Sequence, residues 1–181
     1  MLGPVKSAPP MLESSSLLFA AWALPEAGPA GWTRAVHDAA SHAFLGTVRV
    51  GEPARKAWFS WLRPYRLEVL ETADAALLLT LVRSRSLMRL WDLYDAEEWR
   101  VGSLYPPVLL DADGVRRGFT QILAPDRGEV RSPAGHLLAG FEITAGQAAR
   151  LTFAPDLEAN PFLRMLLVAN VLTLQLPPLY S

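Results

Sequence analysis

The sequence predicts a mainly β fold, of the α+β class, in which antiparallel hairpins close into a barrel around one C-terminal helix. The first observation is the segment Asn160–Leu176, which is apolar on nearly every side. Such a helix must be surrounded by protein or by lipid. The second is that the preceding chain consists of short strand-like runs, and the third is that turn residues recur between them. Turns separated by roughly 8–12 residues are typical of all-β sandwiches and barrels.

The first part of the chain predicts a disordered lead over residues 1–16. It contains Pro4, Pro9 and Pro10 and no continuous apolar core, so it lacks the pattern of a secretory signal. The apolar run Leu17–Leu24 has a length that suits a strand rather than a membrane span. We therefore expect one domain over residues 17–181 and a cytoplasmic location.

A turn unit recurs along the body of the chain: an Asp-Ala pair, a few residues, then a glycine and a return strand. Asp and Gly supply the chemistry of tight turns, and a glycine inside or beside a strand indicates a bulge or close packing. The copies run from Asp38 to Gly46, from Asp95 to Gly102, from Asp111 to Gly118 and, more loosely, from Ser132 to Gly140.

The runs around these turns are rich in leucine, β-branched and aromatic residues, which favour strands. They are Thr47–Val50, Ala57–Leu62, Leu67–Glu71, Ala76–Arg83, Met88–Tyr94, Val108–Leu110, Phe119–Leu123, Leu137–Ile143 and Ala149–Phe153. Strands do not alternate with helices, so we do not expect a doubly wound parallel sheet.

The helix predicted at about residues 160–176 has clear boundary signals. Asn160 can cap it, Pro161 stands where no backbone N–H is needed, and Pro177 and Pro178 end it. The run from Pro161 to Leu176 would be about 25 Å long as a helix.

A membrane span needs about 20 apolar residues, so this run is short for one. Arg164, Asn170 and Gln175 within it would also be costly in hydrocarbon. We therefore predict that the helix is buried in the barrel, with a short membrane anchor as the alternative.

Composition excludes several classes of function. A net charge of −1 argues against nucleic-acid binding, and the absence of cysteine excludes disulfides, thiolate zinc sites and cysteine nucleophiles. His37, Asp38 and His42 match no common zinc spacing, and the segment Asp111–Gly114 lacks the later ligands of a calcium loop. We expect no enzyme activity and no cofactor.

Two segments carry a resemblance to a known superfamily. One is Tyr94–Gly102, the clearest of the repeated hairpins, and the other is Leu151–Glu158, a strand that leads directly into the apolar helix. In order and content they resemble the tubby-like superfamily, in particular the phospholipid scramblase and LURP-one-related families. The resemblance implies a closed barrel of about twelve strands around a central helix.

The chain also departs from the scramblase pattern. Scramblases carry an acidic segment, proposed to bind calcium, where this chain has Ala145, Gly146, Gln147 and Ala148. A calcium site needs several oxygen ligands, commonly carboxylates, so we do not expect calcium regulation of this type. The cysteines that are palmitoylated in scramblases are also absent.

The candidate binding site lies between Arg49 and Arg89, a stretch with eight basic and four acidic residues. Arginine binds phosphate bidentately, and tryptophan and tyrosine prefer the headgroup boundary of a membrane. The predicted site for lipid head groups comprises Arg49, Arg55, Lys56, Arg63 and Arg66 together with Trp58, Trp61 and Tyr65. Alternatively, the arginines only solvate the outer face of a barrel whose core contains the two tryptophans.

Three functional hypotheses follow. The first is a non-catalytic domain that binds anionic phospholipid or phosphoinositide head groups at a membrane surface, since the tubby-like superfamily that the chain resembles includes phosphoinositide binders. The second is a protein-interaction or scaffold barrel without a lipid ligand. The third is a phospholipid scramblase without calcium regulation, which requires Leu163–Leu176 to be accessible to lipid.

Overall fold

The computed structural model describes residues 11–23, 31–51, 66–72, 75–83, 90–144, 146, 148–157 and 160–176. These residues form a 3-10 turn, η1 (Met11–Glu13), twelve strands and the helix α1 (Pro161–Leu174). The strands are β1 (Ser16–Phe19), β2 (Thr33–Asp38), β3 (Phe44–Gly51), β4 (Arg66–Glu71), β5 (Leu77–Arg83), β6 (Trp91–Asp95), β7 (Arg100–Tyr105), β8 (Val108–Asp111), β9 (Arg116–Ala124), β10 (Arg127–Arg131), β11 (Leu137–Ile143) and β12 (Ala149–Phe153).

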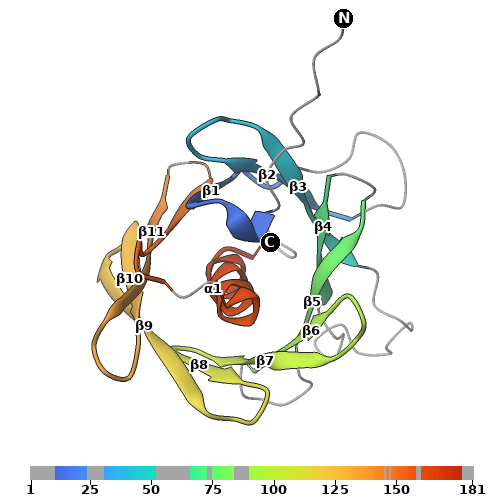
Figure 1. The fold of residues 1–181 in the computed structure, drawn as a ribbon. Helices are drawn as coiled ribbons and strands as arrows, with labels where there is room; N and C mark the ends of the chain where they lie inside the picture. Colours follow the sequence, from blue (N-terminus) through green and yellow to red (C-terminus); the bar gives the residue numbers. More distant parts are fainter. Residues whose placement is uncertain are drawn as a thin grey trace, which may run out of the picture.

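The strands close into one antiparallel barrel, and α1 lies inside it, which confirms the predicted fold class (Figure 1). Each strand pairs with its neighbours in the sequence, and β1 closes the barrel by pairing with β12 through Leu17 and Leu151. A barrel of about eight strands is filled by its own side chains, whereas a wider one needs further contents. In this barrel the helix supplies them.

The two ends of the barrel differ, because the connections of an up-and-down barrel alternate between them. The turns β2–β3, β6–β7, β8–β9 and β10–β11 lie at the end where α1 begins. We call it the Asp-turn end. At the opposite end, α1 finishes beside the start of β2, and the β3–β4 connection leaves from Gly51 and returns at Arg66. We call it the arginine end.

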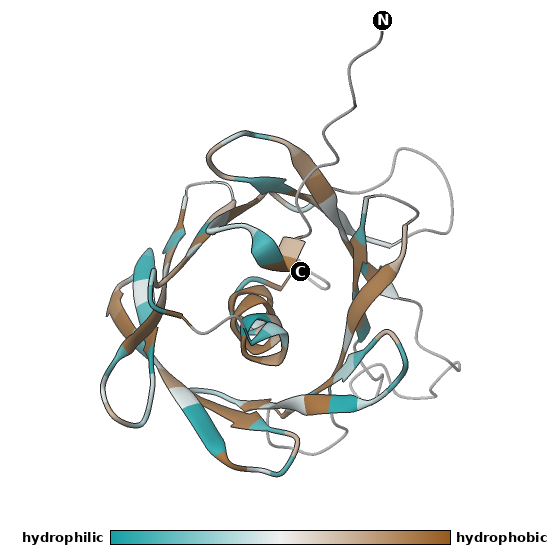
Figure 2. Ribbon diagram, viewed as in Figure 1, coloured by the Kyte–Doolittle hydropathy of each residue, from teal (hydrophilic) through white to brown (hydrophobic). Residues whose placement is uncertain are grey.

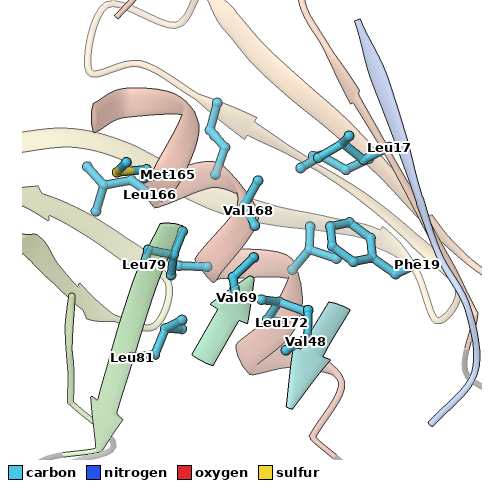
Figure 3. Close-up of a cluster of buried hydrophobic side chains, with 14 of the residues drawn as sticks. Leu17, Phe19, Val48, Val69, Leu79, Leu81, Met165, Leu166, Val168 and Leu172 are labelled. Carbon is cyan, nitrogen blue, oxygen red and sulfur yellow. The ribbon is translucent and has the colours of Figure 1, made fainter. Parts of the chain in front are cut away.

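The core forms where the strands present their inward side chains to α1. Strand positions alternate between buried and less buried, as in β2 and β12, and every residue of α1 from Met165 to Leu172 is buried. Figure 2 shows the helix as mainly hydrophobic. In Figure 3, Val168 and Leu172 lie among side chains from β1, β3, β4 and β5, including Phe19 and Val69. Full burial of one such aliphatic side chain contributes about 1.5–3 kcal/mol.

Buried hydrogen bonds hold the C-terminal end of α1. The guanidinium of Arg34, a residue only 1% exposed, donates to the carbonyls of Phe19 and Ala20 and to Oε1 of Gln175. The indole N–H of Trp22 donates to the Gln175 carbonyl at 2.6 Å. Burial lowers the pKa of Arg34 to about 10, so the side chain is charged at neutral pH. Its positive charge lies at the end of the helix where the macrodipole is negative.

The other polar side chains of α1 also have partners inside the barrel. Arg164 donates to the carbonyls of Leu12 and Ser14, and its guanidinium lies 4.8 Å from the ring centroid of Phe153. Thr120 of β9 donates to Oδ1 of Asn170 at 2.9 Å. The helix that is apolar in sequence is therefore hydrogen-bonded, at two of its few polar positions, to β9 and to the segment before β1.

Ordered structure begins before the predicted domain boundary, so the disordered lead predicted over residues 1–16 is wrong from Met11 onward. Met11 is 1% exposed, and its side chain packs beside Gly46. Its N–H donates to a carboxylate oxygen of Glu71 at 2.9 Å. The sequence lacks a local signal for this segment, because its partners lie on β3, β4 and α1.

The repeated Asp-Ala units form hairpin turns, as predicted. In two of them an Asp Oδ1 accepts the backbone N–H groups of the residues two and four positions later: Asp95 from Glu97 and Trp99, and Asp111 from Asp113 and Val115. The fourth residue of each turn has positive φ, 64° at Glu98 and 78° at Gly114. The β2–β3 turn after Asp38 is one residue longer, with positive φ at His42.

In the first three copies the glycine after the turn directly follows a β-bulge, where the sequence predicted a bulge or close packing. A Cβ at Gly46 or Gly102 would lie 2.1 or 2.3 Å from a backbone oxygen of the neighbouring strand. The fourth copy differs. The register shift between Val130 and Arg131 places Ala139, not Gly140, at the matching position, and a Cβ at Gly140 would meet nothing within 4 Å.

The helix is shorter than the predicted range, ending at Leu174 with Gln175 as its cap. No helix in the part of the chain that the structure describes is long and apolar enough to cross a membrane.

Candidate functional site

The structure describes two of the eight predicted site residues. Arg49 lies on β3 and Arg66 lies at the start of β4. The other six, Arg55, Lys56, Trp58, Trp61, Arg63 and Tyr65, lie outside the described residues, as does the predicted strand Ala57–Leu62.

Arg49 and Arg66 share one carboxylate on the outer wall of the barrel. Arg49 Nε lies 2.5 Å from Glu68 Oε2, and Arg66 Nε lies 2.9 Å from Glu68 Oε1. The arginine side chains are 53% and 43% exposed, whereas that of Glu68 is 13% exposed. Two guanidinium groups around one carboxylate leave a local charge of +1, and the exposed faces of both can accept an anion.

These arginines flank the connection that carries the other candidates. Gly51 and Arg66 are register partners, so the two ends of this connection lie side by side next to the Arg49–Glu68–Arg66 cluster. Residues 52–65 themselves lie outside the described residues. In sequence, that connection has three basic residues and one acidic residue. Strands β3, β4 and β5 are neighbours, so the described part of the basic stretch forms one wall of the barrel.

A cavity that the sequence did not reveal opens at the Asp-turn end. It has a volume of about 560 Å³ and lies between the β6–β7 turn, the β8–β9 turn and the first turn of α1. Its apolar lining comes from Trp99, Val101, Ala112, Phe162, Leu163 and Leu166. Trp99 is 74% exposed and Phe162 is 50% exposed.

The two arginines that line this cavity form ion pairs with nearby aspartates. Arg117 lies 2.7 Å from a carboxylate oxygen of Asp111, and Arg100 lies 3.3 Å from Asp92. Burial raises the pKa of Asp111, but hydrogen bonds from Val115 and Arg117 and the charge of Arg117 outweigh this effect and lower it overall. Both lining arginines are therefore already paired with carboxylates.

Other carboxylates near the cavity are not paired with cations. Over the described ranges, Asp95, Glu97, Glu98 and Asp113 form no ion pair. They are also not arranged as metal ligands, because the described chain contains no group of three or more His, Asp or Glu side chains placed to hold a metal. The segment Asp111–Gly114 is a hairpin turn, as expected.

Part of this cavity had a signal in the sequence. The repeated turn places Trp99 and Val115 at the same position, four residues after the turn Asp, and both side chains are exposed. The remaining wall, Phe162 and Leu163, comes from the helix, some sixty residues away in the chain. No local sequence pattern indicates that the start of the helix lies beside the β6–β7 turn.

Comparison of the chain with models of protein families, with curated proteins and with solved structures finds no match. The resemblance to the tubby-like superfamily therefore remains a prediction from the sequence.

Proposed function

We propose that this protein is a non-catalytic, tubby-like and scramblase-related domain of the cytoplasm that binds anionic phospholipid or phosphoinositide head groups at a membrane surface. The arginine end is the binding surface. The observation that carries the proposal is the pair Arg49 and Arg66, which share Glu68 beside the connection that holds Arg55, Lys56 and Arg63. The same connection holds Trp58, Trp61 and Tyr65.

The physical reasons are charge and side-chain chemistry. Juxtamembrane basic residues gain about 1 kcal/mol each near an anionic leaflet, so several arginines and a lysine together produce useful affinity. The sequence of the same connection contains two tryptophans and a tyrosine, and these residue types favour the headgroup boundary of a membrane. Attachment is peripheral in this proposal, because the apolar helix is enclosed by the strands.

Vesicle sedimentation tests the proposal. The intact chain should pellet with vesicles of phosphatidylcholine containing phosphatidylserine or a phosphoinositide, not with phosphatidylcholine alone, and salt should weaken the binding. The variant Arg49→Gln/Arg55→Gln/Arg63→Gln/Arg66→Gln should bind about tenfold more weakly or worse. Equal pelleting with neutral and anionic vesicles would contradict the proposal.

The control removes two arginines from the other end of the barrel. Arg116 is exposed on β9, and Arg131 lies at the end of β10. The variant Arg116→Gln/Arg131→Gln should bind anionic vesicles like the unmodified chain. A similar loss in both variants would mean that total charge, rather than the arginine end, determines binding.

Scrambling without calcium regulation would require α1 to contact lipid. Leu166, Leu167 and Val171 are each 1% exposed or less, so such contact would require the barrel to open. Labelling of α1 by a hydrophobic photoprobe in vesicles would support this alternative over peripheral binding.

A further inference from the structure

The cavity at the Asp-turn end points to a second binding site, on the opposite end of the barrel from the proposed lipid surface. We propose that it binds a cationic peptide segment of a partner protein, in which an apolar side chain enters the cavity and a neighbouring lysine or arginine meets the acidic rim. This inference does not depend on the lipid-binding proposal.

The first argument is the exposed aromatic surface. Trp99 and Phe162 line the same cavity as the buried residues Val101 and Leu166, yet they are 74% and 50% exposed. Grouped exposed apolar side chains mark interaction sites more often than scattered ones. A few residues contribute most of the binding energy at protein interfaces, and tryptophan is enriched among them.

The second argument is the size and position of the cavity. A volume of about 560 Å³ is within the range of ligand pockets and accommodates one or two amino-acid side chains. Leu163 and Leu166 form an apolar lining that belongs to the first turns of α1, so the cavity is attached to the rigid centre of the fold. A partner could therefore bind without rearrangement of the barrel.

The third argument is charge, which identifies the occupant as a cation. The lining arginines, Arg100 and Arg117, are paired with Asp92 and Asp111. By contrast, Asp113 lines the cavity and is exposed, and Glu97 and Glu98 are exposed in the turn directly before the lining residue Trp99. Over the part of the chain described, these three acids form no ion pair. A lysine or arginine of the partner would meet both these carboxylates and the face of Trp99, to which a cation is also attracted.

An anionic occupant is disfavoured even though a helix begins here. The side chain of Asn160 already accepts the N–H groups of Phe162 and Leu163, and Pro161 has no N–H. The Arg164 N–H donates to the Asn160 carbonyl. The groups by which a helix N-terminus binds anions are thus already engaged.

Selection from a random dodecapeptide display library tests the proposal. The library is selected in parallel on the intact chain and on the variant Trp99→Ala, whose wild-type side chain is too exposed to support the fold. Peptides enriched on the intact chain alone should carry lysine or arginine next to an apolar residue. Failure to enrich peptides, or enrichment of the same peptides on Trp99→Ala, would overturn the proposal.

Calorimetry with one synthesised, enriched peptide provides the quantitative test. Trp99→Ala should weaken binding at least tenfold, as expected for the loss of an interface anchor. Glu97→Gln/Asp113→Asn should weaken it several-fold, and more so at low salt. Asp126→Asn/Ile122→Ser, which changes an exposed acid and an exposed apolar residue on β9 and the β9–β10 turn, should bind as the unmodified chain does. Equal loss in this control would contradict the proposed location.

Discussion

The two ends of the barrel are built by the same alternation of hairpins but differ in length, charge and chemistry. At the Asp-turn end, short turns stabilised by aspartate surround a cavity with aromatic walls and an acidic rim. At the arginine end, longer connections leave β3 and β5, and the described residues Arg49 and Arg66 share one carboxylate. Because the helix fills the interior of the barrel, the two ends are the parts of the barrel whose chemistry can differ. We assign the binding functions there.

At each end an arginine is hydrogen-bonded near one terminus of the helix: Arg34, which is buried, and Arg164, which is half-buried. Substitution of Arg34 should give the largest effect on stability, and substitution of Arg164 a smaller one. Arg34→Met should lower the free energy of unfolding by about 4 kcal/mol, because Gln175 Oε1 and two buried carbonyls lose donors. Arg164→Met should cost about 2 kcal/mol, since its site is less buried. Urea unfolding measures both. A larger loss for Arg164→Met than for Arg34→Met would contradict this order.

A pair of glycines tests the close approach of strands at the Asp-turn end. Gly102→Ala should cost about 3 kcal/mol, because the new Cβ would lie 2.3 Å from the Leu110 carbonyl oxygen and 3.0 Å from Leu166. Gly140→Ala should be neutral or stabilising by about 0.5 kcal/mol, since its Cβ has open space. Thermal unfolding of the two variants, followed by circular dichroism, compares them directly. Equal destabilisation would contradict the bulge geometry.

Acid should destabilise the barrel through its aspartate turns. Hydrogen bonds from the backbone and hydroxyl of Ser41 lower the pKa of Asp38 from 3.8, and the pKa of Asp111 is also lowered. A carboxylate whose pKa is lowered by folding stabilises the fold above its unfolded-state pKa. That contribution is lost as the pH falls through the folded-state value. Melting temperatures measured from pH 7 to about 2.5 should therefore fall most below about pH 4.

The double variant Asp38→Asn/Asp111→Asn checks the origin of this acid sensitivity. It should be less stable than the unmodified chain at neutral pH, and the difference should shrink as the pH falls. A constant difference across the range would mean that other carboxylates cause the acid transition.

A small effect on stability is expected for the exposed arginine pair on the outer wall. Arg49→Gln removes one exposed ion pair with Glu68 and should change the free energy of unfolding by less than about 1 kcal/mol. The same substitution should nevertheless weaken pelleting with anionic vesicles at low salt. A stability loss larger than that of Gly102→Ala would show that Arg49 is structural rather than available for binding.

The sequence predicted those parts of the fold that depend on local chemistry. Asn160 and Pro161 define the start of α1, and the Asp-Ala pairs predict the turns. Strands with few apolar residues were not recognised. In β10 (Arg127–Arg131) only Val130 is a large apolar residue directed at the core, and β2 (Thr33–Asp38) places Arg34 inward. The partner that makes a buried Arg34 stable, Gln175, is 141 residues away.

The candidate sites also divide into features that local sequence predicts and features that depend on distant partners. Arg49 and Arg66 were proposed from the local excess of basic residues between Arg49 and Arg89, which the sequence displays directly. The cavity at the Asp-turn end was not predicted, because Trp99, Asp111 and Phe162 come from three segments that meet only in the closed barrel. The repeated turn places Trp99 at the same position as Val115, but nothing in the nearby sequence indicates that the start of the helix approaches this turn and completes the cavity.

Hydrogen exchange of the α1 amides, measured with and without vesicles containing phosphatidylserine, tests most directly whether the helix stays enclosed while the ends of the barrel bind. The amides from Leu166 to Leu172 should exchange only through global unfolding and at the same rate in both samples. Fast exchange of these amides in the free protein, or loss of their protection on vesicle binding, would contradict an enclosed helix and favour its insertion into lipid.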